Sequence, residues 1–357
     1  MKLKSILLAG AVAITAALPA GAQDLGLSRI NATVPFGEGG GSDTLVRAVA
    51  PYLSSAFANE PTILVRNEPG GGGIPASNRF AKRANPDGSD FLAMSSSIFI
   101  ANTLGAKQID FTMDDFVPVF IAPMAPLYYV SPSTGATETG DVAGIKGASL
   151  VFGGGRQDSA DILTVLSFDL LGFDVKSVWG LERGGGRIGF ERGEFNVDHQ
   201  TTAAYLRSVQ PLVDEGKAVT LMAGGVIAPS GEIVRDPNFP DVPTFIELYE
   251  EVHGAPLSGP AYEAYYALTS AAITVGKAIV LPSAAPSEVV GAYSAAFEKV
   301  IANPEFRAAN EKALGGYELY TGADAQALCG TVTGMSPEAR AWLADWYAET
   351  VGFSLAQ

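Results

Sequence analysis

Short apolar segments with strand character alternate with amphipathic helical segments along most of this chain, and glycine-rich loops join them. Ile30 to Phe36 is typical of a strand, and the apolar side chains between Leu45 and Ala56 fall on one helical face. The unit recurs after strands at Thr62 to Arg66 and at Phe91 to Met94. Repeated strand, loop and helix units predict an α/β fold with mostly parallel sheets flanked by helices.

The loops between these segments are rich in glycine and in small hydroxyl residues. Gly39 to Gly41 and Gly70 to Gly73 each precede a helix, and Ser95 to Ser97 follow the third strand. Ligands of open α/β sheets bind beyond the carboxyl ends of the strands, where these loops fall. Glycine lets the backbone approach a ligand, and the free N–H groups of a helix start favour an anion. The pattern favours a site for a carboxylate, although it is also typical of simple turns and caps.

Polar side chains in the same loops can add selective hydrogen bonds. Asp43 offers an acceptor to an ammonium, a hydroxyl or a bridging water, and hydroxyls are available from Ser42, Ser95, Ser96 and Ser97. We therefore expect Asp43→Ala to weaken ligand binding without unfolding the protein.

A second series of strand and helix segments begins in the middle of the chain. Ala148 to Phe152 predicts a strand, Gly153 to Gly155 a loop and Ile162 to Leu171 a helix, and a further glycine loop is expected at Gly184 to Gly186. A chain of this length suits two lobes rather than one. Glycine loops on both lobes would form opposite walls of one ligand cleft, which favours a clamp.

We expect the chain to cross between the lobes twice. Residues 23–125 and 272–357 are assigned to lobe 1 and residues 126–271 to lobe 2, joined by a two-crossing hinge. The C-terminal helices predicted at Ser287 to Ala302 and at Glu338 to Thr350 should then pack on lobe 1.

The N-terminus has the features of a secretory signal peptide. Lys2 and Lys4 precede an apolar run from Ile6 to Leu18, and Ala20 and Ala22 form an A-x-A end. A run of about 13 apolar residues is shorter than a membrane-spanning helix requires. We expect residues 1–22 to be removed and the mature chain to be released into the periplasm.

Charge and reactive-residue content exclude several function classes. The net charge of −15 argues against a nucleic-acid or anionic-membrane surface. The single cysteine, Cys329, cannot form an internal disulfide. The clusters that begin at Gly37 and at Gly70 do not complete G-x-G-x-x-G, because Ser42 and Pro75 stand in the third place, and His199 and His253 lack metal-ligand spacing. We expect no catalytic residues, no metal and no cofactor.

Several motifs, in order, resemble those of the extracytoplasmic receptors of tripartite tricarboxylate transporters. The first two are VPFGEGGGSD at Val34 to Asp43 and VRNEPGGGG at Val65 to Gly73. The others are NPDG (85–88), DFTMDDFVPV (110–119), ERGEFNVD (191–198), PDVPTFIEL (240–248), LPSAAPSEVV (281–290) and NPEF (303–306). The likeness covers almost the whole mature chain.

The resemblance implies a two-lobed periplasmic-binding-protein fold of type II that closes around a small organic acid and delivers it to membrane permease subunits. It implies that amides of the two first-lobe loops hold a ligand carboxylate, and it adds Gly154, Asp158 and Ser159 from lobe 2. The predicted ligand-binding residues are Phe36, Gly39, Gly40, Ser42, Asp43, Gly71, Gly72, Gly73, Ser95, Ser96, Ser97, Gly154, Asp158 and Ser159. We expect a monomer.

The sequence departs from the family pattern at a few positions. Glu38 stands where many members have proline, and Ile162 replaces a frequent histidine. Arg156 and Gln157 occupy a stretch that is often small and apolar, so either side chain can reach the ligand. Arg183 and Arg187 are further candidates for pairing a second carboxylate, with a solvated arginine as the alternative.

Two other functions are open at this stage. The closed form of a receptor can be presented to a membrane sensor instead of a permease, and the sequence does not separate these roles. An enzyme is the less favoured alternative, since no nucleophile elbow or Walker loop is present.

Overall fold

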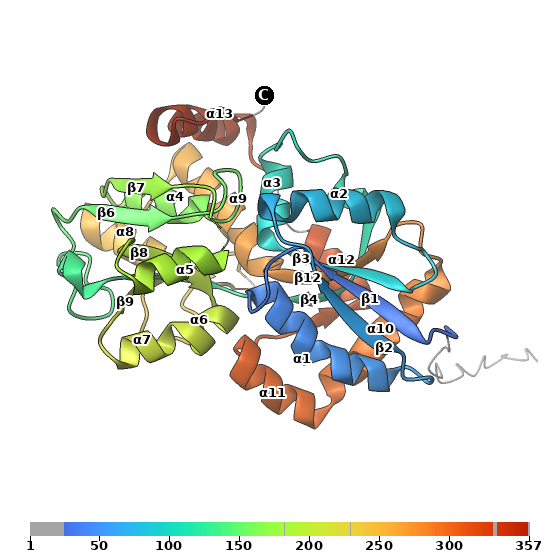
Figure 1. Cartoon of the computed structure of the whole chain (residues 1–357). Coiled ribbons are helices and arrows are strands. Elements are labelled where there is room, and N and C mark those ends of the chain that lie inside the picture. Colours follow the sequence, from blue (N-terminus) through green and yellow to red (C-terminus); the bar gives the residue numbers. More distant parts are fainter. Residues whose placement is uncertain (1–24, 182, 229, 331–333, 356–357) are drawn as a thin grey trace, which may run out of the picture.

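The computed structural model describes residues 25–181, 183–228, 230–330 and 334–355. The predicted signal peptide, residues 1–22, lies outside these ranges. Two sheets organise the chain side by side, each with its own covering of helices (Figure 1). We call the six-stranded sheet and its helices lobe 1, and the five-stranded sheet and its helices lobe 2.

The sheet of lobe 1 has the strand order β13-β4-β12-β3-β1-β2. Strand β1 pairs in parallel with β2 and β3, whereas β12 runs antiparallel between β3 and β4. The strands are β1 (Arg29–Val34), β2 (Thr62–Asn67), β3 (Asp90–Ser95), β4 (Phe116–Ala122), β12 (Lys277–Pro282) and β13 (Tyr320–Thr321). The carboxyl ends of the parallel strands β1, β2 and β3 therefore meet at one edge of the sheet.

Helices follow these strands where the apolar periodicity predicts them. Helix α1 buries Leu45, Val46, Val49 and Leu53, which pack in one core cluster with Tyr293 and Phe297 of α10. These two aromatic side chains of α10 are thus part of the core. The lobe 1 helices are α1 (Gly41–Ala56), α2 (Ile74–Arg83), α3 (Ser96–Thr103), α10 (Ser287–Ala302), α11 (Pro304–Leu314) and α12 (Gly322–Gly330), with short helical turns η1 (Gly71–Gly73) and η2 (Met113–Asp115).

The sheet of lobe 2 has the order β7-β6-β8-β5-β9, with β5 antiparallel to its neighbours. Its strands are β5 (Pro126–Val130), β6 (Leu150–Gly153), β7 (Val175–Val178), β8 (Val197–Thr201) and β9 (Val219–Ala223), beside a small hairpin of β10 (Val226–Ile227) and β11 (Ile233–Val234). The helices are α4 (Ile162–Leu170), α5 (Arg183–Glu191), α6 (Thr202–Ser208), α7 (Gln210–Asp214), α8 (Phe245–His253) and α9 (Gly259–Thr274), with the turn η3 (Pro132–Thr134).

The predicted glycine loop at Gly184 to Gly186 is wrong, because these residues lie in the first turns of α5. The helix forms despite its glycines because its far end is anchored in the core: Phe190 is buried and packs edge-to-face on Tyr129. Tertiary packing outweighs the low helix propensity of the run.

Two crossings between the lobes lie side by side. The first joins β4 to β5, and the second joins α9 to β12. The amide of Met124 in the first donates to the carbonyl of Ile273 in the second at 3.1 Å. A Cβ on Gly276 would lie 2.7 Å from the Met124 amide nitrogen, so only glycine lets the two backbones approach this closely.

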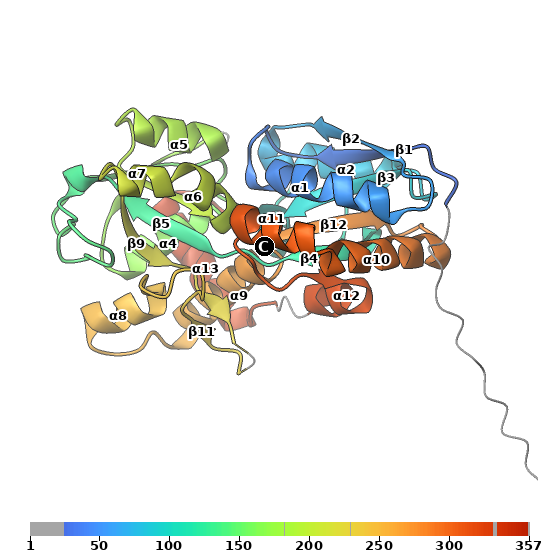
Figure 2. The same cartoon turned by 90° about the horizontal axis from the view of Figure 1, so that it is seen from below.

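The predicted packing of the C-terminal helix on lobe 1 is wrong. Helix α13 (Pro337–Trp346), which continues into a π-helical turn η4 (Tyr347–Val351), buries Leu343 and Trp346 in the core cluster of lobe 2 (Figures 1 and 2). The chain thus passes between the lobes a third time after α12. The periodicity of this helix shows that one face is apolar, but it does not show which lobe covers that face. In the described ranges, no helix is long and apolar enough to cross a membrane.

Candidate functional site

The starts of two helices meet at the carboxyl edge of the lobe 1 sheet. Helix α1 follows Gly40 and helix α3 follows Ser95, and neither N-cap residue makes a side-chain capping bond. The first amides of an α-helix have no intrahelical acceptor and carry partial positive charge. This edge of the sheet therefore presents donors suited to an anion.

Asp43 holds the first loop in shape. Its carboxylate accepts from the Gly39 amide at 2.8 Å, from Asn67 Nδ2 at 3.0 Å and from Arg47 Nε at 2.9 Å. Burial raises the pKa of Asp43, but the bonds from Arg47, Gly39 and Asn67 outweigh it and lower the pKa overall. The carboxylate is used within lobe 1, so Asp43 shapes the loop rather than offering a free acceptor.

The second loop, Gly71 to Gly73, forms the turn η1 with positive φ at all three glycines. A Cβ on Gly73 would lie 3.1 Å from the ring of Phe36, so this glycine packs the two loops together. A Cβ on Gly72 would lie 2.6 Å from Cδ of Arg156, which belongs to lobe 2. Gly72 therefore marks a direct contact between the lobes.

Two serine hydroxyls are buried beside the helix starts. Ser42 is 2% exposed and Ser95 is 5% exposed, and neither Oγ has a hydrogen-bond partner among the described residues. Ser96 is also buried, and its amide donates to Gly276 O at 3.2 Å, whereas Ser97 is partly exposed. Buried hydroxyls are nearly always bonded in folded proteins, so these two indicate a place for a further acceptor or donor.

Sequence reasoning missed Lys277, which lies at the centre of this arrangement. Lys277 begins β12 and pairs across the sheet with Ser95. A Cβ added to Gly41 would lie 2.9 Å from Lys277 Cε, and it would also contact Thr201 Oγ1 of lobe 2. A single lysine opening the otherwise apolar strand KAIVLP is the signal that could have identified it.

The three predicted residues of lobe 2 are used within that lobe. The Gly154 amide donates to Val178 O, and the missing Cβ of Gly154 makes room for the Trp179 ring. Asp158 pairs with Arg156 at 2.7 Å, and Ser159 Oγ donates to Arg156 O at 2.9 Å.

Two arginine side chains of lobe 2 form hydrogen bonds with lobe 1. Arg207 donates to Gly39 O and to Thr44 Oγ1 on the first loop, and Arg156 donates to Gln108 Oε1 at 3.2 Å. Arg187, in contrast, pairs with Glu191 on its own helix. Of the positions at which the sequence departs from the resembled motifs, Glu38 is exposed and Ile162 lies in the core.

Several solved protein structures align with this chain over most of their length. The chain aligns with MatC from Rhodopseudomonas palustris with bound malate at 18% identity and a TM-score of 0.61, over 85% of this chain and 96% of that one. A second protein of that organism, with adipate, aligns at 20% identity and a TM-score of 0.67, over 91% and 98%. A TctC solute-binding protein from Polaromonas aligns at 19% identity and a TM-score of 0.55, over 91% and 98%.

The chain has the fold of periplasmic solute-binding proteins. The predicted two-lobed α/β class is thus confirmed, and the resemblance to tricarboxylate-type receptors holds at the level of fold. No protein-family model and no curated protein matches the sequence.

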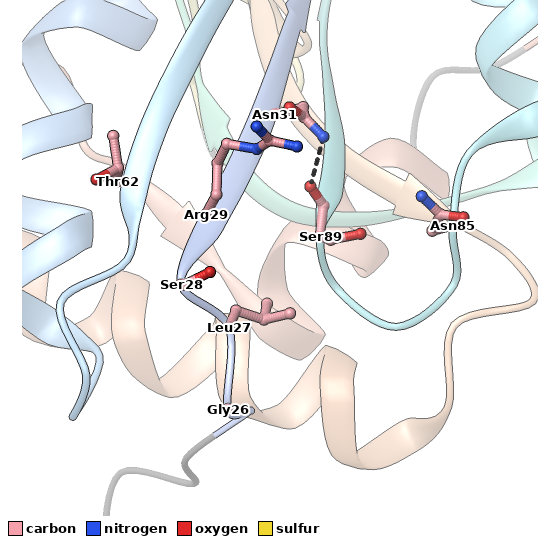
Figure 3. A pocket seen from close by; sticks show the side chains of 8 residues that line it. All are labelled: Gly26, Leu27, Ser28, Arg29, Asn31, Thr62, Asn85 and Ser89. Atoms are coloured by element: carbon pink, nitrogen blue, oxygen red, sulfur yellow. Dashed lines mark hydrogen bonds between the residues drawn. The ribbon is translucent and has the colours of Figure 1, made fainter.

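A hollow of about 750 Å³ lies at the opposite edge of the lobe 1 sheet (Figure 3). The amino ends of β1, β2 and β3 line this hollow, with Arg29, Asn31 and Ser89 among the lining residues. In a periplasmic-binding-protein fold the ligand site is expected at the carboxyl ends of the strands. This hollow is therefore not the candidate site.

The His199 imidazole and the Cys329 thiol, which could serve catalysis or metal binding in another setting, are packed inside the protein. His199 is buried and its Nδ1 lies 2.7 Å from Thr164 Oγ1. Burial raises the pKa of the Cys329 thiol to about 12, which leaves it protonated at neutral pH. No metal-binding group of three or more His, Cys, Asp or Glu occurs in the ranges described.

Replacing Gly72 with alanine should hinder the contact between the lobes. The new Cβ would overlap the Arg156 stem, so the variant should shift towards an open form and have a larger radius of gyration in small-angle scattering. Gly216→Ala is the matched control, because Gly216 has a nearly equal φ (+68° against +65°) and no atom within 4 Å of the new Cβ. Equal scattering from both variants would contradict a role for Gly72 in lobe contact.

Proposed function

We propose that this protein is an extracytoplasmic solute-binding receptor that captures a small organic acid between its lobes. The observation that carries the proposal is the meeting of the uncapped starts of α1 and α3 beside the buried, unpartnered hydroxyls of Ser42 and Ser95. Helix-start amides and hydroxyls are the donors that a carboxylate requires.

Structures with the same fold support the ligand class. Two of them contain malate and adipate, which are small dicarboxylates. The ordered motifs of the sequence support membership of the tripartite tricarboxylate receptor family, delivery of the ligand to membrane permease subunits and a periplasmic location. The proposed receptor is a monomer and performs no chemistry on its ligand.

The proposed residues differ between the two lobes. The amides of the Gly40 and Gly72 loops and the hydroxyls of Ser42 and Ser95 contact the acid directly. Asp43 supports the first loop. Asp158 and Ser159 shape the Arg156 loop, which closes over the ligand from lobe 2.

A panel of citrate, malate, adipate and benzoate tests the proposal by thermal shift and calorimetry. At least one acid should raise the melting temperature and reduce the radius of gyration, because a ligand that binds only the closed native state stabilises it. The matched controls are the corresponding uncharged amides, which should not bind. Binding of the amides as tightly as the acids, or of no compound at all, would contradict the proposal.

A further inference from the structure

The ammonium group of Lys277 is buried between the lobes. The residue is 5% exposed, and a Cβ added to Gly41 at the start of α1 would lie 2.9 Å from Lys277 Cε and 3.0 Å from Thr201 Oγ1 of lobe 2. It also lies directly across from Ser95, whose hydroxyl is unpartnered. The cation is therefore at the point where both helix starts and both lobes come together.

The protein offers this cation little compensation. Among the described residues, Nζ donates to one carbonyl, that of Gly276, at 3.1 Å. Within the described ranges, no carboxylate lies at ion-pair distance from Lys277. An ammonium has three donors, and burying its charge without a counter-ion is costly. Burial accordingly lowers the pKa of Lys277 to about 8, so at neutral pH the group is still mainly charged.

The ionisable groups on the surrounding elements are engaged elsewhere. Strand β4 carries none over its length. On α1, Asp43 is bonded to Arg47, and on β3, Asp90 is bonded to Asn31 and Asn85. From lobe 2, Asp198 accepts from Tyr129 and Gln200, His199 bonds to Thr164, and Arg207 donates to the first loop.

Three sources of positive potential therefore converge here, and among the described residues the one carboxylate in the first turn of α1, Asp43, is already paired with Arg47. The starts of α1 and α3 contribute partial charges, and the Lys277 ammonium contributes a full one. We propose that Lys277 is the counter-ion of a ligand carboxylate, which bonds to its Nζ and to the hydroxyls of Ser42 and Ser95. This inference rests on the proposed function and deepens it: the ligand must be anionic at this end, and a neutral isostere is rejected because it would leave the ammonium unpaired.

Lys277→Met keeps the length of the side chain and removes its charge. Affinity for the panel acid that binds wild type most tightly should fall by about 100-fold or more, as expected when a buried charge pair loses one partner. The melting temperature of acid-free Lys277→Met should match or exceed that of wild type, because the variant no longer buries an uncompensated charge. If Lys277 had only a structural role, its replacement would lower the melting temperature of the acid-free protein together with the affinity for the acid.

Lys299→Met is the matched control. Lys299 also donates to a single backbone carbonyl, that of Ala56 at 3.0 Å, but it is exposed and lies on α10, away from the helix starts. This variant should bind the same acid with unchanged affinity.

The pH dependence gives a second readout. In wild type, deprotonation of Lys277 removes the counter-ion, so affinity should be constant at lower pH and fall as the pH rises through about 8. In Lys277→Met the affinity should show no such change. Equal affinities of wild type and Lys277→Met for citrate, malate, adipate and benzoate would overturn the role of Lys277 and leave the receptor function standing. Failure of wild type to bind any of the four acids would overturn both.

Discussion

Replacing Trp346 with alanine is expected to lower the free energy of unfolding by roughly 3–5 kcal/mol, the range for removing a large aromatic side chain from a core. Trp346 is 7% exposed and belongs to the same core cluster as Phe168 and Leu171 of lobe 2. Its indole N–H also donates to Asp169 at 2.7 Å. The variant therefore creates a cavity and removes a hydrogen bond between α13 and α4.

Urea denaturation, followed by circular dichroism, measures this effect. Trp342→Ala is the control, because Trp342 lies one turn earlier on the same helix and is only partly buried. Its loss should be clearly smaller. If both variants lost the same stability, the attachment of α13 to lobe 2 through Trp346 would be contradicted.

Replacing Asp43 with alanine is the second large effect, with an expected loss of roughly 2–4 kcal/mol. The substitution removes the acceptor of the Gly39 amide and one of the two acceptors of Asn67 Nδ2, which keeps its bond to Phe36 O, and each hydrogen bond to a charged group contributes about 1.5–3 kcal/mol. Ligand affinity should fall as well, because the first loop loses its shape. This differs from the expectation drawn from the sequence, in which only binding was affected.

The pH dependence of the Asp43 effect has a defined sign. The pKa of Asp43 is lowered in the folded protein, so its contribution to stability is complete above the pKa of an unfolded aspartate and is lost as the pH falls through the folded value. The difference between wild type and Asp43→Ala should therefore shrink in acid.

Arg47→Ala is the control for the ion pair alone. The Arg47 side chain is 51% exposed, and exposed pairs contribute at most about 1 kcal/mol. Equal losses from Arg47→Ala and Asp43→Ala would show that the ion pair, and not the loop contacts, carries the effect.

Local patterns were sufficient for most of the fold. The predicted helix at Ser287 to Ala302 matches α10 residue for residue, and β1, β2 and β3 lie within two residues of their predicted bounds. The apolar period sets these elements directly, because each buries one face. The glycine run of α5 and the position of α13 could not be predicted, since packing against another segment decides both.

The candidate site was predicted only in part. The loops at Gly39 and Gly72 and the serines after β3 were recognised because glycine and hydroxyl clusters are visible locally. Lys277 was missed because its importance comes from neighbours far away in the sequence, such as Gly41 and Thr201. Asp43 and Asp158 were assigned to the ligand because a sequence does not show which carboxylates Arg47 and Arg156 already neutralise.

The hydrogen bond between Met124 and Ile273 has a consequence for the order of events in ligand capture. Because it ties the two neighbouring crossings together, we expect them to bend as one in the proposed closure, with the smallest displacements beside that axis. Lys277 is four residues beyond Ile273 and should move little, whereas Arg156 and Arg207, which reach from lobe 2 to lobe 1, should move further. An arriving anion should then meet the nearly fixed charge first, and the two arginines should cover it afterwards.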